Sequence, residues 1–295
     1  MQKLLVSVVM ITYGHEDYII EAIKGVLMQE FDGDIELIIA NDKSPDNTDE
    51  ICEKYFSSIE LSSNISIRYT RHVENKGVIP NFVWALNQAK GEYIAICEGD
   101  DYWIDPLKIQ KQVDFLKSHE EYSACISDRV FYYQDEKKEE YSRYPKIITN
   151  DMILFGEVLP TQCVLFRNIL KFEQFSKFDG HPAGDRILSY LITLVAPVYN
   201  IGDVTSVYRL TGRGAWSQFR DLNQNVINAK SLKDFHDLVG LKRGNKFIKN
   251  RLYLVFDDML RKNNDLDLVE FMKMFNVNYW LLLRFYIHFF RTKYL

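Results

Sequence analysis

The fold is indicated most clearly by residues 92–101, whose sequence is EYIAICEGDD. Residues 92–97 form a short apolar run of the kind found in strands that are buried on both faces of a sheet. Three carboxylates follow at once, those of Glu98, Asp100 and Asp101. Carboxylates this close repel one another unless a cation is bound among them. The stretch therefore predicts a buried strand that ends in a cation site, and the alternative is a solvated acidic turn that caps the next helix.

Three more buried strands are predicted upstream of this one. The first two are short, largely apolar runs at residues 4–11 and 35–40, and residues 65–70 read as the third strand. Helical patterns separate the runs, and the last of these helices begins at Pro80 and ends before Gly91. Strands joined by single helices indicate right-handed crossovers and hence a parallel sheet.

Polar clusters follow three of the four strands. They comprise residues 12–15 (TYGH), 41–44 (NDKS) and 98–101 (EGDD). Ligands bind beyond the carboxyl ends of the strands in such sheets. We therefore expect the three clusters to meet at one edge and to form one binding site.

The second half of the chain continues to mix strands and helices. We expect a helix at 107–118, strands at 123–133, 161–167 and 198–210, and a helix at 185–195. Residues 134–150 are charged and rich in tyrosine, which indicates an exposed hairpin or loop, and Gly202 is expected to interrupt the last strand. From about residue 216 the pattern becomes helical.

Composition narrows the classes of function. The chain has 295 residues and a net charge of −5, so nothing in its overall charge indicates nucleic-acid binding. The four cysteines are widely spaced without a CxxC pair, which favours reduced, structural thiols and a cytoplasmic location. The first residues predict no signal peptide, and no run approaches the roughly 20 apolar residues that span a bilayer.

These motifs together resemble family 2 glycosyltransferases of the GT-A fold. The resemblance is close over about residues 4–118 and thinner to about 217, and it rests on residues 6–13, 36–48, 75–77 and 91–103. It implies an α/β fold with a Rossmann-like mixed sheet and helices on both faces. The catalytic domain would span 1–217, with a nucleotide-binding half at about 1–118 and an acceptor half at about 119–217. A helical region at 218–295, with a basic and aromatic tail, would follow.

The resemblance also implies roles for individual residues. Asp42 would accept a hydrogen bond from the imide of the base, which favours uracil and hence a UDP-sugar. A Mn²⁺ or Mg²⁺ ion would be held by Asp100 or, as the second choice, by Asp101. The residues implied to bind the nucleotide-sugar are Thr12, Tyr13, His15, Asp42, Asn75, Lys76, Glu98, Gly99, Asp100, Arg209 and Trp216.

Asp185 stands where the family has its catalytic base. A carboxylate there would take the proton of the acceptor hydroxyl during an inverting transfer, and the alternative is a residue that caps the helix. The sequence departs from the family pattern at three positions. Glu98 replaces the usual aspartate, Gly184 replaces a carboxylate before Asp185, and Thr211 stands near the usual histidine.

The predicted function is transfer of one sugar to a glycan or lipid-linked acceptor, with inversion, in cell-surface polysaccharide biosynthesis. The Gln-any-any-Arg-Trp motif of processive synthases is missing, which favours a single addition. A dinucleotide oxidoreductase is excluded because no glycine-rich turn follows the first strand. The departures in the motifs keep one alternative open, a non-catalytic glycan-binding or scaffold protein that retains the fold.

The C-terminal tail predicts a membrane contact. If residues 279–291 are helical, Arg284, His288 and Arg291 share one narrow face and leave a wide aromatic surface. Such a helix suits a bilayer interface with anionic lipid, so residues 279–295 are expected to bring a cytoplasmic protein to the inner face of the cell membrane. A helix packed on the catalytic domain or on a partner subunit is the alternative, and the sequence leaves self-association open.

Overall fold

The computed structural model describes residues 3–178, 184–211, 235–237 and 239–240. The chain separates into two compact units, one of residues 1–153 and 157–212, the other of residues 154–156 and 213–295. The sheet and the loops of the site belong to the first unit. The predicted helical region at 218–295, including its tail, lies almost entirely outside the described residues.

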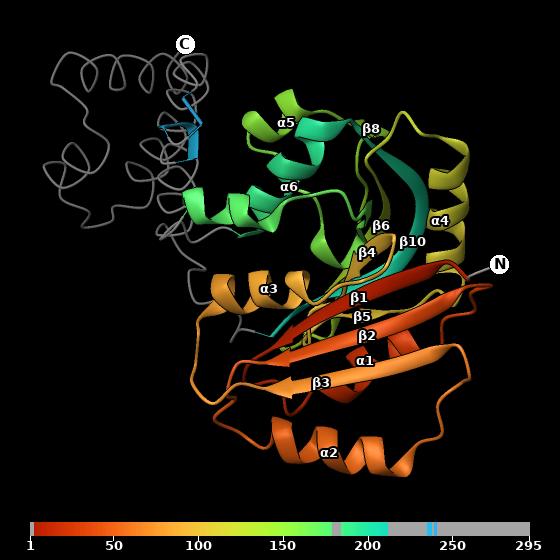
Figure 1. The fold of residues 1–295 in the computed structure, drawn as a ribbon, viewed down its shortest axis with the longest axis vertical. Coiled ribbons are helices and arrows are strands. Elements are labelled where there is room, and N and C mark those ends of the chain that lie inside the picture. Colours follow the sequence, from red (N-terminus) through yellow and green to blue (C-terminus); the bar gives the residue numbers. More distant parts are fainter. Residues whose placement is uncertain (1–2, 179–183, 212–234, 238, 241–295) are drawn as a thin grey trace, which may run out of the picture. The chain divides into compact units, whose positions relative to one another are not determined.

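Four parallel strands form the first half of the sheet, in the order β3-β2-β1-β4. They are β1 (Leu5–Thr12), β2 (Asp34–Asn41), β3 (Ile65–Arg71) and β4 (Tyr93–Ile96). The register pairs Thr12 with Asn41 and Asn41 with Arg71, so β1, β2 and β3 end level with one another, while β4 ends opposite Val9. The predicted parallel strands are thus confirmed, and the loops that follow them leave one edge of the sheet (Figure 1).

Helices cover both faces of these strands. Helices α1 (Ile19–Leu27) and α2 (Thr48–Ser58) lie on one face and α3 (Val78–Asn87) lies on the other (Figure 1). Alternate residues of β1 explain this, because Val8 packs into the core shared with α1 and Val9, on the opposite face, is equally buried. Burial on both faces is why β1, β2 and β4 read as largely apolar runs, whereas the edge strand β3 is only partly buried and its sequence alternates.

The second half turns the sheet into a mixed one. After β4 the order continues β9-β6-β10-β5, where β9 is antiparallel to β4 and β6, β10 is parallel to β6, and β5 is antiparallel to β10. Short strands β7 and β8 pair antiparallel with β6 and β10. The strands are β5 (Tyr102–Trp103), β6 (Ala124–Tyr133), β7 (Lys138–Ser142), β8 (Ile147–Ile148), β9 (Leu165–Arg167) and β10 (Val198–Leu210). The charged stretch after β6 is therefore a hairpin.

The remaining helices are α4 (Lys108–Ser118), α5 (Asn150–Leu154) and α6 (Gly184–Val195), with 3-10 turns η1 (Thr161–Cys163) and η2 (Phe172–Phe178). The single strand predicted at 161–167 is wrong in its first part. The Gln162 carbonyl accepts hydrogen bonds from the Trp103 indole (2.8 Å) and the Ser206 hydroxyl (3.0 Å). These side chains occupy the acceptor that a strand neighbour would need, so pairing begins only at Leu165.

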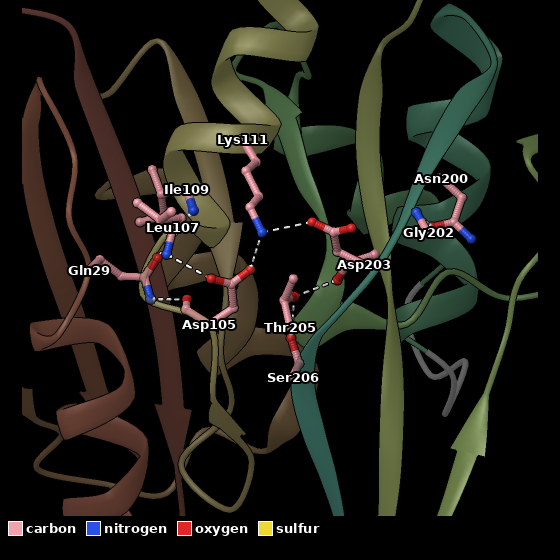
Figure 2. A network of polar contacts seen from close by, with 11 residues as sticks. Gln29, Asp105, Leu107, Ile109, Lys111, Asn200, Gly202, Asp203, Thr205 and Ser206 are labelled. Atoms are coloured by element: carbon pink, nitrogen blue, oxygen red, sulfur yellow. Dashed lines mark hydrogen bonds and ion pairs between the residues drawn. The ribbon is translucent and has the colours of Figure 1, made fainter.

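Gly202 does not divide β10 as predicted, but it marks an irregularity in the strand. The pairing with β6 shifts register between Asn200 and Ser206, and Gly202 has a φ of +82°, which favours glycine. Figure 2 shows how this bulge is held, because Lys111 of α4 donates to Asp203 (2.7 Å) and also to Asp105 (2.8 Å). The bulge is thereby fastened to the loop that precedes α4.

All four cysteines are buried and free, as predicted. Within the described part of the chain, every helix is too short or too polar to cross a membrane.

Candidate active site

The loops after β1 and β2 are tied together by backbone donors and side-chain acceptors. The N–H groups of Gly14, His15 and Glu16 donate to Ser44 Oγ (3.1 Å), Thr48 Oγ1 (3.0 Å) and Asp46 Oδ2 (3.0 Å). Burial alone would raise the pKa of Asp46, but hydrogen bonds from Thr48 and Glu16 outweigh it and lower the pKa. A charged carboxylate therefore holds two of the three predicted polar clusters in contact.

Asp42 directly follows β2 and fixes a third loop. Its side chain is 3% exposed, and its two oxygens accept from the backbone N–H groups of Lys76 (2.7 Å) and Gly77 (2.9 Å). Asn75 donates to the Asp42 carbonyl at 3.0 Å. The structure thus brings Asn75 and Lys76 beside Asp42. The neighbouring Lys43 has a φ of +59°, a conformation that a non-glycine residue adopts at a cost.

The turn at 98–101 packs closely against the end of β1. Gly99 donates from its backbone to Ile11 O (3.0 Å), and a Cβ at this position would lie 2.8 Å from both Thr12 Oγ1 and His15 Nδ1. Only glycine allows this approach. Among the described residues, no hydrogen-bond partner is found for three buried atoms here, namely Thr12 Oγ1, His15 Nδ1 and Glu98 Oε2.

The two aspartates of the turn differ in their surroundings. The Asp100 side chain is 23% exposed and lies 3.8 Å from His15 Nε2. Asp101 is 2% exposed, and its Oδ1 accepts from the backbone N–H of Arg209 at 2.9 Å. Asp100 is therefore the aspartate that a ligand can reach, and Asp101 anchors the turn to β10.

Arg209 reinforces that anchor. Its Nε donates to the Asp100 carbonyl (3.1 Å) and its guanidinium pairs with Glu21 of α1. The same group lies over the rings of Tyr18 and Tyr102, each 4.8 Å from the ring centroid. Arg209 therefore uses its guanidinium to hold α1, β5 and the acidic turn together.

Each acidic side chain of the site makes ionisation of the neighbouring carboxyl groups less favourable. Burial raises the pKa of Glu98 to about 7, and the nearby charges of Asp100 and Asp185 add to the rise. Burial also raises the pKa of Asp101 well above its usual range, with Asp100 and Glu98 as further causes. A bound cation would relieve this repulsion.

Asp185 lies in the first turn of α6. One of its oxygens accepts from the backbone N–H of the next residue, Arg186 (2.7 Å). The preceding residue, Gly184, packs against Ile79 in the first turn of α3, next to the loop at 75–77, and the charge of Asp185 adds to the raised pKa of Glu98. The structure thus brings Asp185 together with the clusters at the sheet edge, while Trp216 lies outside the described residues.

A divalent cation can be tested against the residues present. No three His, Cys, Asp or Glu side chains within the described ranges are arranged as a complete metal-binding set. An ion that is shared with substrate phosphates needs only one or two protein carboxylates. The partly exposed Asp100, beside the unpartnered Glu98 oxygen, meets that need, whereas Asp101 is buried and already bonded.

Comparison with known proteins agrees with this site. Residues 7–182 match the family model for glycosyl transferase family 2, which is more than half of the chain. The protein therefore belongs to glycosyl transferase family 2.

Two relatives illustrate the range of similarity. An uncharacterised protein of Mycobacterium tuberculosis is 33% identical over 219 residues, covering 71% of this chain. The chain spans only 60% of the length of that relative. The Escherichia coli protein WfaP, a UDP-Glc:alpha-D-GlcNAc-diphosphoundecaprenol beta-1,3-glucosyltransferase, is 26% identical over 243 residues, which cover 80% of this chain and 91% of WfaP.

Solved structures share the fold. TarS of S. aureus in complex with UDP-GlcNAc has a TM-score of 0.57 at 17% identity, with 88% of this chain and 81% of that chain covered. The mannosyltransferase PcManGT of Pyrobaculum calidifontis, in complex with GDP-Man and Mn²⁺, has a TM-score of 0.58 at 13% identity, with 97% and 84% covered. These likenesses confirm the predicted α/β GT-A fold.

Sequence reasoning missed two side chains that lie near the acidic turn, Arg129 of β6 and Gln162 of η1. Arg129 had a detectable signal, because it is a charged residue inside an otherwise apolar strand. Gln162 had none, since the prediction placed it in a strand.

Proposed function

We propose that the protein transfers a single sugar, with inversion, from a UDP-sugar to a hydroxyl group of a glycan or lipid-linked acceptor in polysaccharide biosynthesis. The observation that carries this proposal is the convergence of Asp42, Asp100 and Asp185 at one edge of the sheet. The named activity of WfaP and the UDP-GlcNAc bound by TarS support the choice of donor.

In this proposal each loop contributes a separate task. Asp42 and the loop at 75–77 recognise the base, with the half-exposed ring of Tyr13 beside it. Thr12, His15 and Gly99 line the path of the diphosphate. A Mn²⁺ or Mg²⁺ ion held by Asp100, with Asp101 behind it, would neutralise charge on the leaving diphosphate.

Asp185 acts as the base in this scheme. A carboxylate near the anomeric carbon can accept the proton of the attacking hydroxyl. Two observations support this role: the start of α6 packs against the first turn of α3, and the charge of Asp185 adds to the raised pKa of Glu98. Arg209 is assigned to holding the acidic turn, because its guanidinium already pairs with Glu21.

Calorimetry with UDP tests the donor site. UDP should bind wild-type protein more tightly with Mn²⁺ than without it, and Asp100→Asn should remove most of that difference. Equal affinity with and without Mn²⁺ would contradict the metal assignment.

The base is tested by Asp185→Asn, which should retain UDP binding and lose transfer by about 10² to 10⁴-fold, the range for a general base. Asp151→Asn is the matched control, because Asp151 also lies in the first turn of a helix. Full transfer by Asp185→Asn would exclude this base. Metal-dependent UDP binding without any transfer by the wild type would favour the non-catalytic glycan-binding alternative.

Two further predictions fall on residues outside those described. Membrane contact through 279–295 and stacking by Trp216 stay predictions from the sequence, as does self-association.

A further inference from the structure

A buried amide lies next to the acidic turn without a complete set of partners. Gln162 is fully buried, and its Oε1 accepts from Arg129 Nη1 at 3.3 Å. The backbone carbonyl of Gln162 accepts the hydrogen bonds from Trp103 and Ser206 described above, which fixes the backbone at this residue. Among the described residues, its Nε2 has no hydrogen-bond acceptor. The side chain is thus held in place with its donor group unused.

Arg129, next to Gln162, also has a buried N–H group without an acceptor among the described residues. Its guanidinium lies over the rings of Phe131 (4.4 Å), Tyr208 (4.8 Å) and Tyr144 (5.6 Å). The buried Arg129 Nε has no acceptor within the ranges that the structure describes. Aromatic faces hold the cation in place but leave this N–H group unpaired.

Both side chains adjoin the acidic turn. Arg129 lies over the ring of Tyr208, and the next residue in the chain, Arg209, donates its backbone N–H to Asp101 (2.9 Å). The Gln162 backbone carbonyl accepts from Trp103, two residues after Asp101. The 3-10 turn η1, which contains Gln162, contacts β4, and β4 ends two residues before Glu98. The unpartnered Glu98 Oε2 therefore belongs to the same cluster as Gln162 and Arg129.

Unpaired buried donors and acceptors disfavour folding. A ligand that forms hydrogen bonds with these donors and this acceptor would offset that cost. The cluster offers two N–H donors and one carboxyl oxygen, flanked by aromatic rings. A phosphate fits poorly because it would face Glu98. Neighbouring hydroxyl groups of a sugar fit well, since each hydroxyl both donates and accepts, and the rings can pack against its apolar face.

We propose that Gln162, Arg129 and Glu98 form a subsite that binds neighbouring hydroxyl groups of a pyranose. This inference rests on the proposed function, because the pyranose would belong either to the sugar of the donor or to the terminal sugar of the acceptor. Gln162 determines specificity here, because its fixed amide dictates where an acceptor oxygen of the sugar must lie.

The test compares UDP with UDP-sugars. Gln162→Leu removes the amide at similar volume, and Arg129→Lys keeps a cation over the rings but lacks Nε. For each variant we would measure thermal stability, binding of UDP with Mn²⁺, and binding and KM for the UDP-sugar that the wild type uses best among UDP-glucose, UDP-galactose and their N-acetylamino forms. The acceptor KM would be measured with N-acetylglucosamine linked through diphosphate to a short lipid.

Both variants should bind UDP within about twofold of the wild type. If the subsite holds the donor sugar, affinity for the UDP-sugar should fall about tenfold, the effect of one lost hydrogen bond. If it holds the acceptor sugar, the acceptor KM should rise by a similar factor while UDP-sugar binding stays unchanged. Either result supports the subsite.

Arg167→Lys is the matched control. Arg167 is also next to an aromatic ring, that of Tyr93, but its donors are used by the carbonyls of Tyr122, Leu116 and His119. This variant should lose stability with both KM values unchanged.

Two outcomes overturn the inference in different ways. If the wild type transfers sugar and folded Gln162→Leu or Arg129→Lys has unchanged affinity and KM for both substrates, the subsite is wrong while the proposed function stands. If the wild type neither binds nor transfers any sugar of the panel, the proposed function fails and the subsite fails with it.

Discussion

Lys108 is a fully buried lysine whose charge opposes folding. It lies in the first turn of α4, where its Nζ donates to Gln112 Oε1 (2.7 Å) and lies 4.3 Å from the ring centroid of Trp103. Burial lowers its pKa from 10.5 to about 8, and the neighbouring groups that oppose the shift are Cys163, Cys97, Cys125 and Asp105. One hydrogen bond and one aromatic face do not replace the water that an ammonium group loses.

The size and direction of the effect follow from linkage. A shift from 10.5 to about 8 is 2.5 pKa units, which corresponds to roughly 3 kcal/mol. The folded pKa is the lower one, so between pH 8 and 10.5 the unfolded chain binds more protons than the folded chain. The free energy of unfolding therefore gains this amount as pH rises through that window, and below pH 8 the full penalty is present.

Lys108→Met should remove the penalty while it fills the same space. At pH 7 we expect the free energy of unfolding to rise by about 1–2 kcal/mol, because losing the contacts with Gln112 and Trp103 costs about 1 kcal/mol or more of the gain. Urea unfolding at pH 7, 8, 9 and 10 measures this, and the variant should show a flatter pH dependence than the wild type.

Lys117→Met is the control, since Lys117 is exposed in the last turn of the same helix. It should leave the pH dependence unchanged. Lower stability of Lys108→Met at pH 7, combined with the wild-type pH dependence, would refute the reasoning.

Three further predictions concern the loops of the site. Gly99→Ala should lower the free energy of unfolding by about 1–3 kcal/mol and weaken UDP binding, because its Cβ would lie 2.8 Å from Thr12 and His15 atoms. Unchanged urea unfolding and unchanged UDP affinity by calorimetry would contradict this. Gly202→Ala is the control, because Gly202 has a positive φ but, among the described residues, no atom beyond its chain neighbours lies within 4 Å of the added Cβ. Asp46→Asn should lose up to about 1 kcal/mol at pH 7, discounted for its partial exposure. The difference from wild type should shrink as pH falls from 3.8 through the lower pKa of the folded state, and a difference that does not shrink below pH 3.8 would count against the reasoning. Lys43→Gly should raise the free energy of unfolding by about 0.5–1 kcal/mol, and a decrease would show that the positive φ is not strained.

The parallel half of the sheet and the placement of its loops could be predicted from the sequence. Runs such as residues 93–97 (YIAIC) are apolar without alternation, which is a direct consequence of burial on both faces. Once the strands are parallel, topology alone places Thr12, Asp42 and Glu98 at one edge. No long-range contact had to be guessed for that result.

Contacts between distant segments set the limits of prediction. The strand predicted at 161–167 failed because side chains of Trp103 and Ser206 use the Gln162 carbonyl. The burial of Lys108 was equally invisible, since a lysine in an amphipathic helix usually faces water. The same holds for Arg209, whose partners Glu21 and Asp101 are far away in the sequence.

The bond from Arg209 to Asp101 also has a consequence for synthesis of the protein. The anchor of the acidic turn is 108 residues further along the chain. When the four parallel strands and the turn at 98–101 have emerged from the ribosome, all three polar clusters of the sheet edge are present. β10, the strand that fastens the acidic turn, has not yet been synthesised. The site should therefore form late, after β10 has emerged, and nascent chains that stop before residue 209 should contain the sheet without a fixed acidic turn.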